Sequence, residues 1–217
     1  MKRRAWKGRF IVFEGIDGSG TTTQATLAAA ALRSDGFRVL QTREPSGRPI
    51  GRLIRQALQG RVGLPGGSGP LTEETLALLF AADRLDHLEA EILPALRQGQ
   101  LVICDRYLLS SLAYQGAACS IDWVEQINAG AVTPDLTIFL EVKLAAASRR
   151  RAARGGSREL FESDVRQRQV SRQYRAAIAR LAKRDRILVL DGGRPVDQVA
   201  VEAQKAIRQL AARSAVG

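Results

Sequence analysis

The sequence has few of the residues that build secreted, zinc-binding or membrane-spanning proteins. Only two of its 217 residues are cysteines, Cys104 and Cys119, which is too few for a disulfide framework or a zinc site. We therefore expect two reduced thiols and a cytoplasmic location, where disulfides are rare. No apolar run approaches the roughly 20 residues that span a bilayer, and no signal-peptide segment follows the basic N-terminus.

Aromatic residues are also scarce, at 5% of the chain, although the formal net charge is +11. A basic surface can bind nucleic acid, but no aromatic side chains alternate with the arginines to make a base-stacking platform. Much of the positive charge lies in the N-terminal tail, residues 1–8, and between residues 149 and 186. Clustered arginine equally suits a multiply charged phosphate ligand, so nucleic-acid binding stays only an alternative.

Five short and mostly continuous apolar runs predict buried parallel strands, at residues 10–13, 37–41, 101–104, 136–140 and 187–190. Helices are predicted between and after them, at residues 22–33, 72–97, 122–128, 161–183 and 195–213. The alternation predicts one three-layer α/β/α domain over residues 1–217, with a five-stranded parallel sheet. Residues 60–70, rich in glycine and proline, predict a flexible loop.

Residues 10–24, FIVFEGIDGSGTTTQ, have the pattern of a strand, a glycine-rich loop and a helix start. The spacing of two glycines fits the P-loop G-x-x-x-x-G-K-[ST], whose backbone N–H groups bind phosphate. The lysine position, however, holds a threonine, which can form a hydrogen bond but supplies no charge. The sequence predicts nucleotide phosphate binding at Gly15, Ile16, Asp17, Gly18, Ser19, Gly20, Thr21, Thr22 and Thr23.

A second strand end carries the carboxylate that a P-loop needs nearby to hold magnesium. Four apolar residues at 101–104 precede Asp105. Ligands collect at the carboxyl ends of parallel strands, so we expect Asp105 and the Thr22 hydroxyl to reach one Mg²⁺. Taken alone, Asp105 would be interpreted as a loop residue or a helix cap.

Four segments together resemble bacterial thymidylate kinase, a P-loop nucleoside monophosphate kinase family, in order and in spacing. They are FEGIDGSG at 13–20, TREPSG at 42–47, FAADR at 80–84 and DRYLLSSLAYQG at 105–116, the last being the most specific. The resemblance covers nearly the whole chain. It implies a P-loop NTPase fold, transfer of the γ-phosphoryl group of ATP to the 5′-phosphate of dTMP, a requirement for Mg²⁺, and a homodimer.

The resemblance also implies roles for single residues. Arg106 resembles the arginine that clamps the acceptor phosphate, with Arg55 close to it. Phe80 resembles the ring that stacks on thymine, and Arg84 the donor to thymine O4, while Asp17 would lie near the 3′-hydroxyl and the metal. The other residues implied at the dTMP site are Glu44, Pro45, Ser110, Ser111 and Gln115.

Several of these residues also have structural interpretations. Phe80 could belong to the core, Arg84 could pair with Asp83 or Asp86 on the surface, and Ser111 could cap the helix that runs through Tyr114. His87, the only histidine, is expected to be a surface or packing residue, because phosphoryl transfer to an ionised phosphate needs no catalytic base.

Residues 148–162, SRRRAARGGSRELFE, resemble the arginine-bearing lid of the family. In members with glycine after the P-loop acid, as at Gly18 here, the lid provides a catalytic arginine. Arg154 and Arg158 fit that role best, and Arg150 and Arg151 less well, although all of them could be a solvated helix face. We expect lid arginines to compensate for Thr21. A kinase for another nucleoside monophosphate and a catalytically weak nucleotide-binding protein remain alternatives.

Overall fold

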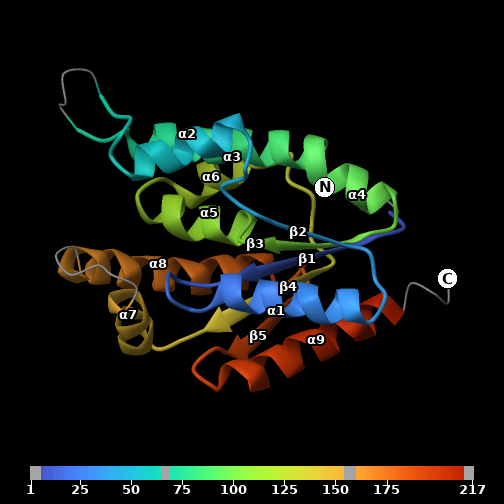
Figure 1. Cartoon of the computed structure of the whole chain (residues 1–217). Coiled ribbons are helices and arrows are strands. Elements are labelled where there is room, and N and C mark those ends of the chain that lie inside the picture. The colour runs from blue at the N-terminus through green and yellow to red at the C-terminus, as the bar shows by residue number, and fades with distance from the viewer. Residues whose placement is uncertain (1–5, 65–68, 154–159, 213–217) are drawn as a thin grey trace.

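The five predicted strands form one parallel sheet in the order β2-β3-β1-β4-β5 (Figure 1). The computed structural model describes residues 6–64, 69–153 and 160–212, with side chains in the last range from residue 165 onward. All strands point to the left in Figure 1, where the loops after them gather. The strands are β1 Arg9–Glu14, β2 Val39–Arg43, β3 Leu101–Asp105, β4 Leu136–Glu141 and β5 Ile187–Asp191.

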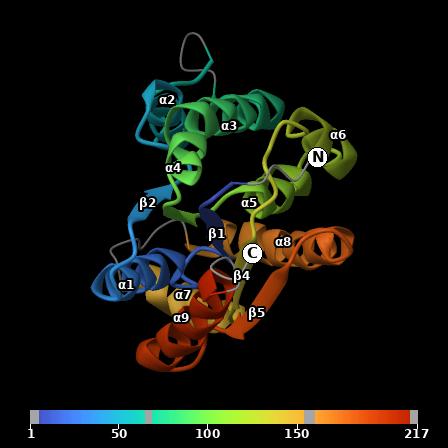
Figure 2. The same cartoon turned by 90° about the vertical axis from the view of Figure 1, so that its right-hand side faces the viewer.

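Helices cover both faces of the sheet (Figures 1 and 2), which confirms the α/β/α architecture of a P-loop NTPase fold. Helices α1 and α9 pack against each other on one face, whereas α5 and α8 pack together on the other. The helices are α1 Thr21–Ser34, α2 Pro49–Leu58, α3 Glu73–His87, α4 Leu93–Arg97, α5 Leu108–Tyr114, α6 Ile121–Ile127, α7 Leu144–Ala152, α8 Leu160–Leu181 and α9 Val196–Ala212.

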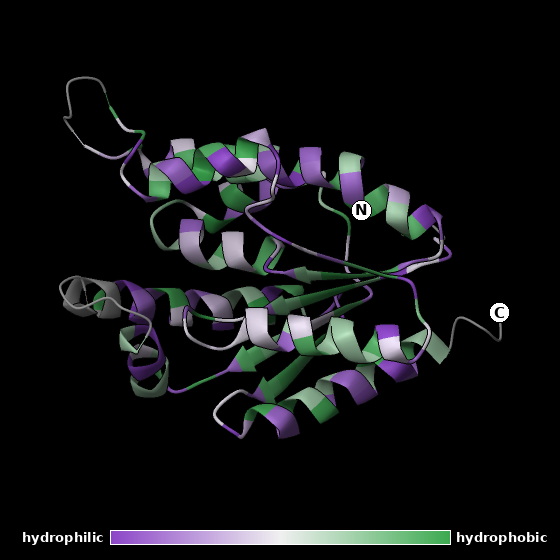
Figure 3. Cartoon of the chain, viewed as in Figure 1, coloured by the Kyte–Doolittle hydropathy of each residue, from purple (hydrophilic) through white to green (hydrophobic). Residues whose placement is uncertain are grey.

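Strand β1 joins the two halves of the core because its side chains alternate between the faces. Phe10 and Val12 belong to the cluster beneath α5 and α8, whereas Ile11 and Phe13 belong to the cluster beneath α1 and α9. All four side chains are buried, and the strands are the most continuously hydrophobic part of Figure 3. Burial on both faces explains the continuous apolar runs in the sequence.

The predicted helix at 72–97 is divided in the structure. Helix α3 ends at His87, a π-helical turn follows at Leu88–Ile92, and α4 completes the segment. Pro94 has no backbone N–H and clashes with the preceding turn of a regular helix. A wider turn just before it accommodates the proline without ending the helix.

Helix α2 was missed by the sequence analysis. Its start carries a recognisable signal, since Pro49 occupies the first helical position, where a missing N–H costs nothing. Gly51, Ile54 and Ala57 form its buried face. In the glycine-rich loop, Gly63 pairs with Pro70 in an isolated antiparallel bridge, while residues 65–68 lie outside the described ranges.

The N-terminal tail is described only from residue 6. Trp6 is half-buried against the core, and the Gly8 N–H donates to the Leu96 carbonyl at 3.0 Å. This part of the tail is therefore packed. In the described ranges, none of the helices has the length and apolar character that crossing a membrane would require.

Candidate active site

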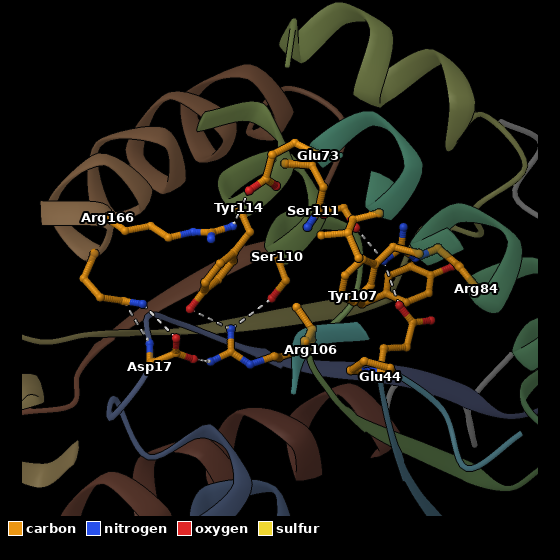
Figure 4. A pocket seen from close by; sticks show the side chains of 16 residues that line it. Asp17, Glu44, Glu73, Arg84, Arg106, Tyr107, Ser110, Ser111, Tyr114 and Arg166 are labelled. Atoms are coloured by element: carbon orange, nitrogen blue, oxygen red, sulfur yellow. Dashed lines mark hydrogen bonds and ion pairs between the residues drawn. The ribbon is translucent and has the colours of Figure 1, made fainter. Parts of the chain in front are cut away.

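A cavity of about 610 Å³ opens beside the carboxyl ends of β1, β2 and β3 (Figure 4). It contains nearly every residue that the sequence predicted at the acceptor site, although these come from separate parts of the chain. Its lining includes Asp17, Glu44, Pro45, Phe80, Arg84, Arg106, Ser110, Ser111 and Gln115.

Arg55 is the exception among these predicted residues. It lies outside the cavity lining, and its guanidinium donates to the carbonyls of Pro45 and Ser46, both at 2.7 Å. The side chain therefore holds the loop that forms the wall of the cavity. Phe80 is half-buried and faces the cavity rather than the core, so the core interpretation was wrong.

Arg106 is fixed in the site by both its backbone and its side chain. Its φ of 70° is left-handed, a conformation uncommon for a residue other than glycine, and its N–H donates to the Phe13 carbonyl at 2.8 Å. The guanidinium donates to the Gly15 carbonyl and to Asp17 Oδ1, each at 2.9 Å. A guanidinium has five N–H donors, so those not used in these two bonds can bind an anion that enters the cavity.

The environment of this guanidinium favours its charged form. Burial alone would lower the pKa of Arg106, but Tyr114, Tyr174 and Asp17 more than offset burial and hold the pKa well above its ordinary value. The guanidinium also lies 5.3 Å from the ring centroid of Tyr114, a distance that allows a cation–π interaction. A permanent positive charge is thus present where the P-loop meets the cavity.

Glu14 is a buried carboxyl group that the sequence analysis missed. It accepts hydrogen bonds from the Tyr107 N–H at 2.8 Å and from the Ser110 N–H and hydroxyl at 3.1 and 2.6 Å. Burial raises the pKa of Glu14, which is fully enclosed. These contacts tie the end of β1 to the start of α5. A charged residue at the end of an apolar strand was the available signal.

Helix α8 holds the P-loop through two residues that the sequence did not single out as functional. Gln167 and Tyr174 lie seven residues apart and so share one helix face. The Gln167 amide donates to Asp17 Oδ2 at 2.7 Å and accepts from the Asp17 N–H at 3.3 Å. The buried Tyr174 hydroxyl donates to the Gly15 carbonyl at 3.0 Å. This face of α8 therefore positions the P-loop.

Arg84 lies in a buried polar network at the opposite end of the cavity. Its Nη2 donates to Glu44 Oε2 at 2.7 Å and to Ser111 Oγ at 3.0 Å, and its Nη1 donates to Asn128. The guanidinium lies 4.9 Å from the ring centroid of Tyr107. Because Arg84 and Glu44 are 1% and 5% exposed, their pairing neutralises two charges away from water.

Two structural interpretations of this region were wrong. Arg84 pairs with Glu44 and not with Asp83 or Asp86, whose carboxylates accept from Ser46 and Arg48. The capping interpretation of Ser111 also fails, because this residue lies within helix α5, whose N-cap is Tyr107. Tertiary contacts, rather than neighbours in the sequence, select these partners.

The P-loop itself follows β1 and leads into α1 at Thr21. Gly20, at the N-cap, has φ 99° and α1 has no side-chain cap, so the first N–H groups of the helix can bind an anion. Thr21 is 5% exposed and supplies no charge there. Gly18 has φ 87°, and a Cβ on it would lie 2.5 Å from the Ala147 carbonyl oxygen. Glycine therefore lets α7 pack directly against the loop.

Two arginines of α7 reach the P-loop across this contact. The Arg151 guanidinium donates to the Asp17 carbonyl at 2.9 Å. The Arg150 guanidinium lies 3.4 Å from the Ser19 carbonyl oxygen. These two side chains, the weaker candidates by sequence, thus bring positive charge to the loop. Arg154 and Arg158, the predicted catalytic arginines, lie outside the described residues.

The two residues predicted to hold magnesium are in contact with each other. The Thr22 hydroxyl donates to Asp105 Oδ2, while Asp105 Oδ1 is buried without a hydrogen-bond partner. An orphaned carboxylate oxygen beside a phosphate-binding loop fits a hard cation. Within residues 6–64, 69–153 and 160–212, no group of three or more histidine, cysteine or acidic side chains could hold a metal ion. Mg²⁺ commonly completes its shell with water and substrate phosphates instead.

The sheet order, the glycine-rich loop after β1 and the acidic end of β3 define a P-loop NTPase-type protein. A family model described as thymidylate kinase matches residues 13–203. The chain belongs to the thymidylate kinase family and is therefore an enzyme, a kinase.

Individual relatives agree with this assignment. The chain is 45% identical over 183 residues to a probable thymidylate kinase of Pyrococcus abyssi, a match covering 84% of this chain and 88% of the relative. It is 40% identical over 211 residues to a thymidylate kinase of Pelotomaculum thermopropionicum, covering 94% of each. A thymidylate kinase of Thermomicrobium roseum is 43% identical over 198 residues, covering 88% and 90%. Because archaeal and bacterial relatives both match, these similarities show the family but do not show that the protein is of the predicted bacterial type.

Proposed function

We propose that the protein phosphorylates dTMP to dTDP with ATP as the phosphoryl donor and Mg²⁺ as the metal. One observation carries the proposal: a preformed arginine, Arg106, joins the P-loop to a cavity that contains the predicted thymine-binding residues. Family membership supports the same reaction. The acceptor oxygen of dTMP is already ionised, so positioning and charge neutralisation provide the catalysis.

The acceptor end of the cavity has the groups that a thymine ring requires. Phe80 offers an aromatic face for stacking, and Arg84 offers donors suited to the O4 acceptor of thymine, where cytosine has a donor. Ser111 and Gln115 lie on the same wall, and the buried Gln115 Oε1 has no hydrogen-bond partner. An unpaired acceptor supports binding of a ligand that presents an N–H group, as thymine does.

Nearer the P-loop, the cavity suits a phosphate and a deoxyribose. We propose that Arg106 clamps the acceptor phosphate together with Ser110, while Asp17 binds the 3′-hydroxyl group. Gln167 and Arg106 hold the two carboxylate oxygens of Asp17 in place. Glu44 and Pro45 form the wall that Arg55 supports from behind.

On the donor side, backbone N–H groups of the P-loop would bind the ATP phosphates. Thr22 and Asp105 would hold Mg²⁺, which supplies Lewis-acid stabilisation of phosphate charge when bound. We propose that arginines of the lid region compensate for the charge missing at Thr21. The Arg150 and Arg151 contacts with the loop support this role for α7, alongside the predicted Arg154 and Arg158.

The decisive experiment is a coupled kinase assay with ATP, Mg²⁺ and a panel of dTMP, dUMP, dCMP and dGMP. We expect turnover with dTMP well above that with the other three acceptors. Faster turnover with another monophosphate would instead establish a kinase of different specificity. EDTA in excess over Mg²⁺ is the control for the metal requirement.

A second candidate is a nucleotide-binding protein with little or no catalysis, favoured by the buried Thr21 at the lysine position. Such a protein would bind dTMP and ATP in calorimetry without forming ADP. The presence of Asp17, Thr22, Asp105 and Arg106 in one site argues for retained catalysis, because binding alone does not require this set.

We also propose a homodimer and a cytoplasmic location. Helices α2 and α3 pack side by side, and their outer surface carries Leu53, Leu78 and Leu85, which are 37%, 52% and 46% exposed. Exposed leucines on two helices that pack together favour a protein interface. Size-exclusion chromatography with light scattering tests the dimer, and Leu78→Glu should convert it to monomer. Two free thiols favour a reducing compartment.

A further inference from the structure

The acceptor wall is the side of the cavity that Glu44, Pro45 and Arg84 form between β2 and α3. His87 is buried in the polar network behind this wall, although nothing in the proposed reaction uses it. Its side chain is 0% exposed. One ring nitrogen, Nε2, lies 2.7 Å from the Thr42 hydroxyl oxygen, and the other, Nδ1, lies 3.4 Å from Glu44 Oε1. The other oxygen of that carboxylate accepts from Arg84. The expectation of a surface or simple packing residue therefore does not describe its contacts.

The spacing of residues along β2 and along α3 explains how His87 meets its polar partners. Thr42 and Glu44 are two residues apart at the end of β2, so their side chains share one face. Arg84 and His87 are three residues apart on α3 and also share a face. The strand pair meets the helix pair, and Glu44 is contacted by both helix residues. Its carboxylate thus has one oxygen held by Arg84 and the other facing the imidazole.

The position of one proton follows from this arrangement. An ionised carboxylate is only an acceptor, so the imidazole nitrogen that faces Glu44 has to be the donor. The nitrogen near Thr42 can accept from the hydroxyl or donate to it, because a hydroxyl does either. Glu91 Oε2 lies 3.7 Å from this second nitrogen and, as an acceptor, favours its protonated form, so a ring protonated on both nitrogens also fits the site.

We propose that His87 is a positioning residue for substrate binding, whose Nδ1–H holds the Glu44 carboxylate in the orientation that fixes Arg84 at the cavity. The inference rests on the proposed function, in which Arg84 binds the thymine base. His87 contacts Glu44 and lies outside the cavity lining, so it acts through that carboxylate. Loss of the contact should weaken dTMP binding while leaving phosphoryl transfer nearly unchanged, since binding is affected equally in ground and transition states.

The first test is made on the wild-type protein and requires no activity. His87 is the only histidine in the chain, so a long-range ¹H–¹⁵N correlation spectrum reports this one ring. We expect Nδ1 to be protonated, either in the neutral ring or in the imidazolium. A neutral ring with its proton on Nε2 alone would overturn the proposal. The spectrum decides this point even if the protein phosphorylates no monophosphate.

The second test is a matched pair of variants. His87→Asn retains an amide donor at the position of Nδ1 and loses the contact with Thr42, whereas His87→Gln retains a polar group near Nε2 and loses the donor to Glu44. We expect His87→Gln to raise the KM for dTMP about tenfold, with kcat and the KM for ATP changed less than about threefold. His87→Asn should raise the KM for dTMP about threefold or less.

Thr42→Val is the control, because it removes the other hydrogen bond of the imidazole and leaves the contact with Glu44. It should change the KM for dTMP less than about twofold. Equal effects of the Asn and Gln variants, or a loss of kcat without a change in KM, would show a packing role and overturn the proposal. Absence of wild-type turnover would instead refute the proposed function.

Discussion

Arginine has different partners in two regions of the molecule. One is the acceptor wall, between β2 and α3, and the other is the donor region, between the P-loop and α7. At the acceptor wall, Arg84 is 1% exposed and pairs with a buried carboxylate, with further bonds to Ser111 and Asn128. In the donor region, the Arg150 and Arg151 guanidiniums contact backbone carbonyls. The carbonyls that Arg150 contacts carry no charge that could cancel the charge of its guanidinium, whereas the Glu44 carboxylate cancels that of Arg84.

This difference indicates how each region would treat its ligand. The acceptor wall is neutral and has its donors fixed before binding, which suits a base whose shape and hydrogen bonds must be distinguished. The donor region presents positive charge that can transfer from carbonyls to phosphate oxygens when ATP enters. Arg106 lies between the two regions, and its side chain is 20% exposed.

The largest expected effect is on the acceptor wall. Arg84→Met should lower the free energy of unfolding by about 3–5 kcal/mol, because Glu44 would be left buried without its partner. Urea unfolding monitored by circular dichroism measures the change. Glu44→Gln in the same chain should recover part of the loss. If Arg84→Met costs no more than a surface substitution, the acceptor wall is not a buried ion-pair network.

Arg106→Lys tests the residue between the two regions. We expect kcat/KM for dTMP to fall about a hundredfold, because a lysine cannot reproduce the planar fork that bonds Gly15, Asp17 and a phosphate together. Steady-state kinetics measure the fall. Arg180→Lys is the matched control, because it also replaces an arginine by lysine, but at an exposed ion pair between α8 and Glu125. It should leave kcat/KM unchanged. A loss below about threefold for Arg106→Lys would contradict the clamp.

Arg150→Met tests the donor region with the same replacement, arginine by methionine, that Arg84→Met makes at the acceptor wall. We expect little change in the free energy of unfolding, because no buried partner is left behind, and a roughly tenfold fall in kcat/KM for ATP. Thr21→Lys should restore most of this loss in the Arg150→Met chain and add little to the wild-type chain. A large gain from lysine in the wild-type chain would show that α7 does not replace the missing charge.

The smallest expected effect concerns Glu14 and pH. Burial raises the pKa of its carboxyl above the ordinary value of 4.5, so the folded state binds more protons above pH 4.5 than the unfolded state. The stability that Glu14 contributes is then complete below pH 4.5 and declines as the pH rises through the folded pKa. Urea unfolding at several pH values should show this decline for the wild type and not for Glu14→Gln. If the free energy of unfolding varied with pH in the same way for both chains, Glu14 would make no such contribution.

Much of the site was predictable because its residues lie in short motifs at strand ends. The P-loop, Asp105 and the segment from Arg106 to Gln115 fall where the strand pattern places them, since parallel strands end at one edge of the sheet. Their roles in the reaction remain predictions. The missed contacts involve residues far apart in the sequence, such as Glu14 with Tyr174 and Asp17 with Gln167.

Local patterns failed where partners compete. Arg84 has carboxylates one residue before it and two residues after it, yet the structure pairs it with Glu44, which approaches from β2. The π-helical turn before Pro94 is a different case. The segment was predicted to be helical through residue 97, and it is, but no local pattern indicated the wider turn that precedes the proline.

Short-range patterns predicted three chemical features in their order along the chain: a phosphate loop without its lysine, an acidic strand end, and an arginine-rich segment in the C-terminal half. These features depend on spacing within a few residues. The tertiary structure selected which charged groups pair, because ion pairs and buried hydrogen bonds form between segments that the sheet brings together. It placed His87 against Glu44 and brought Arg150 to the Ser19 carbonyl of the P-loop.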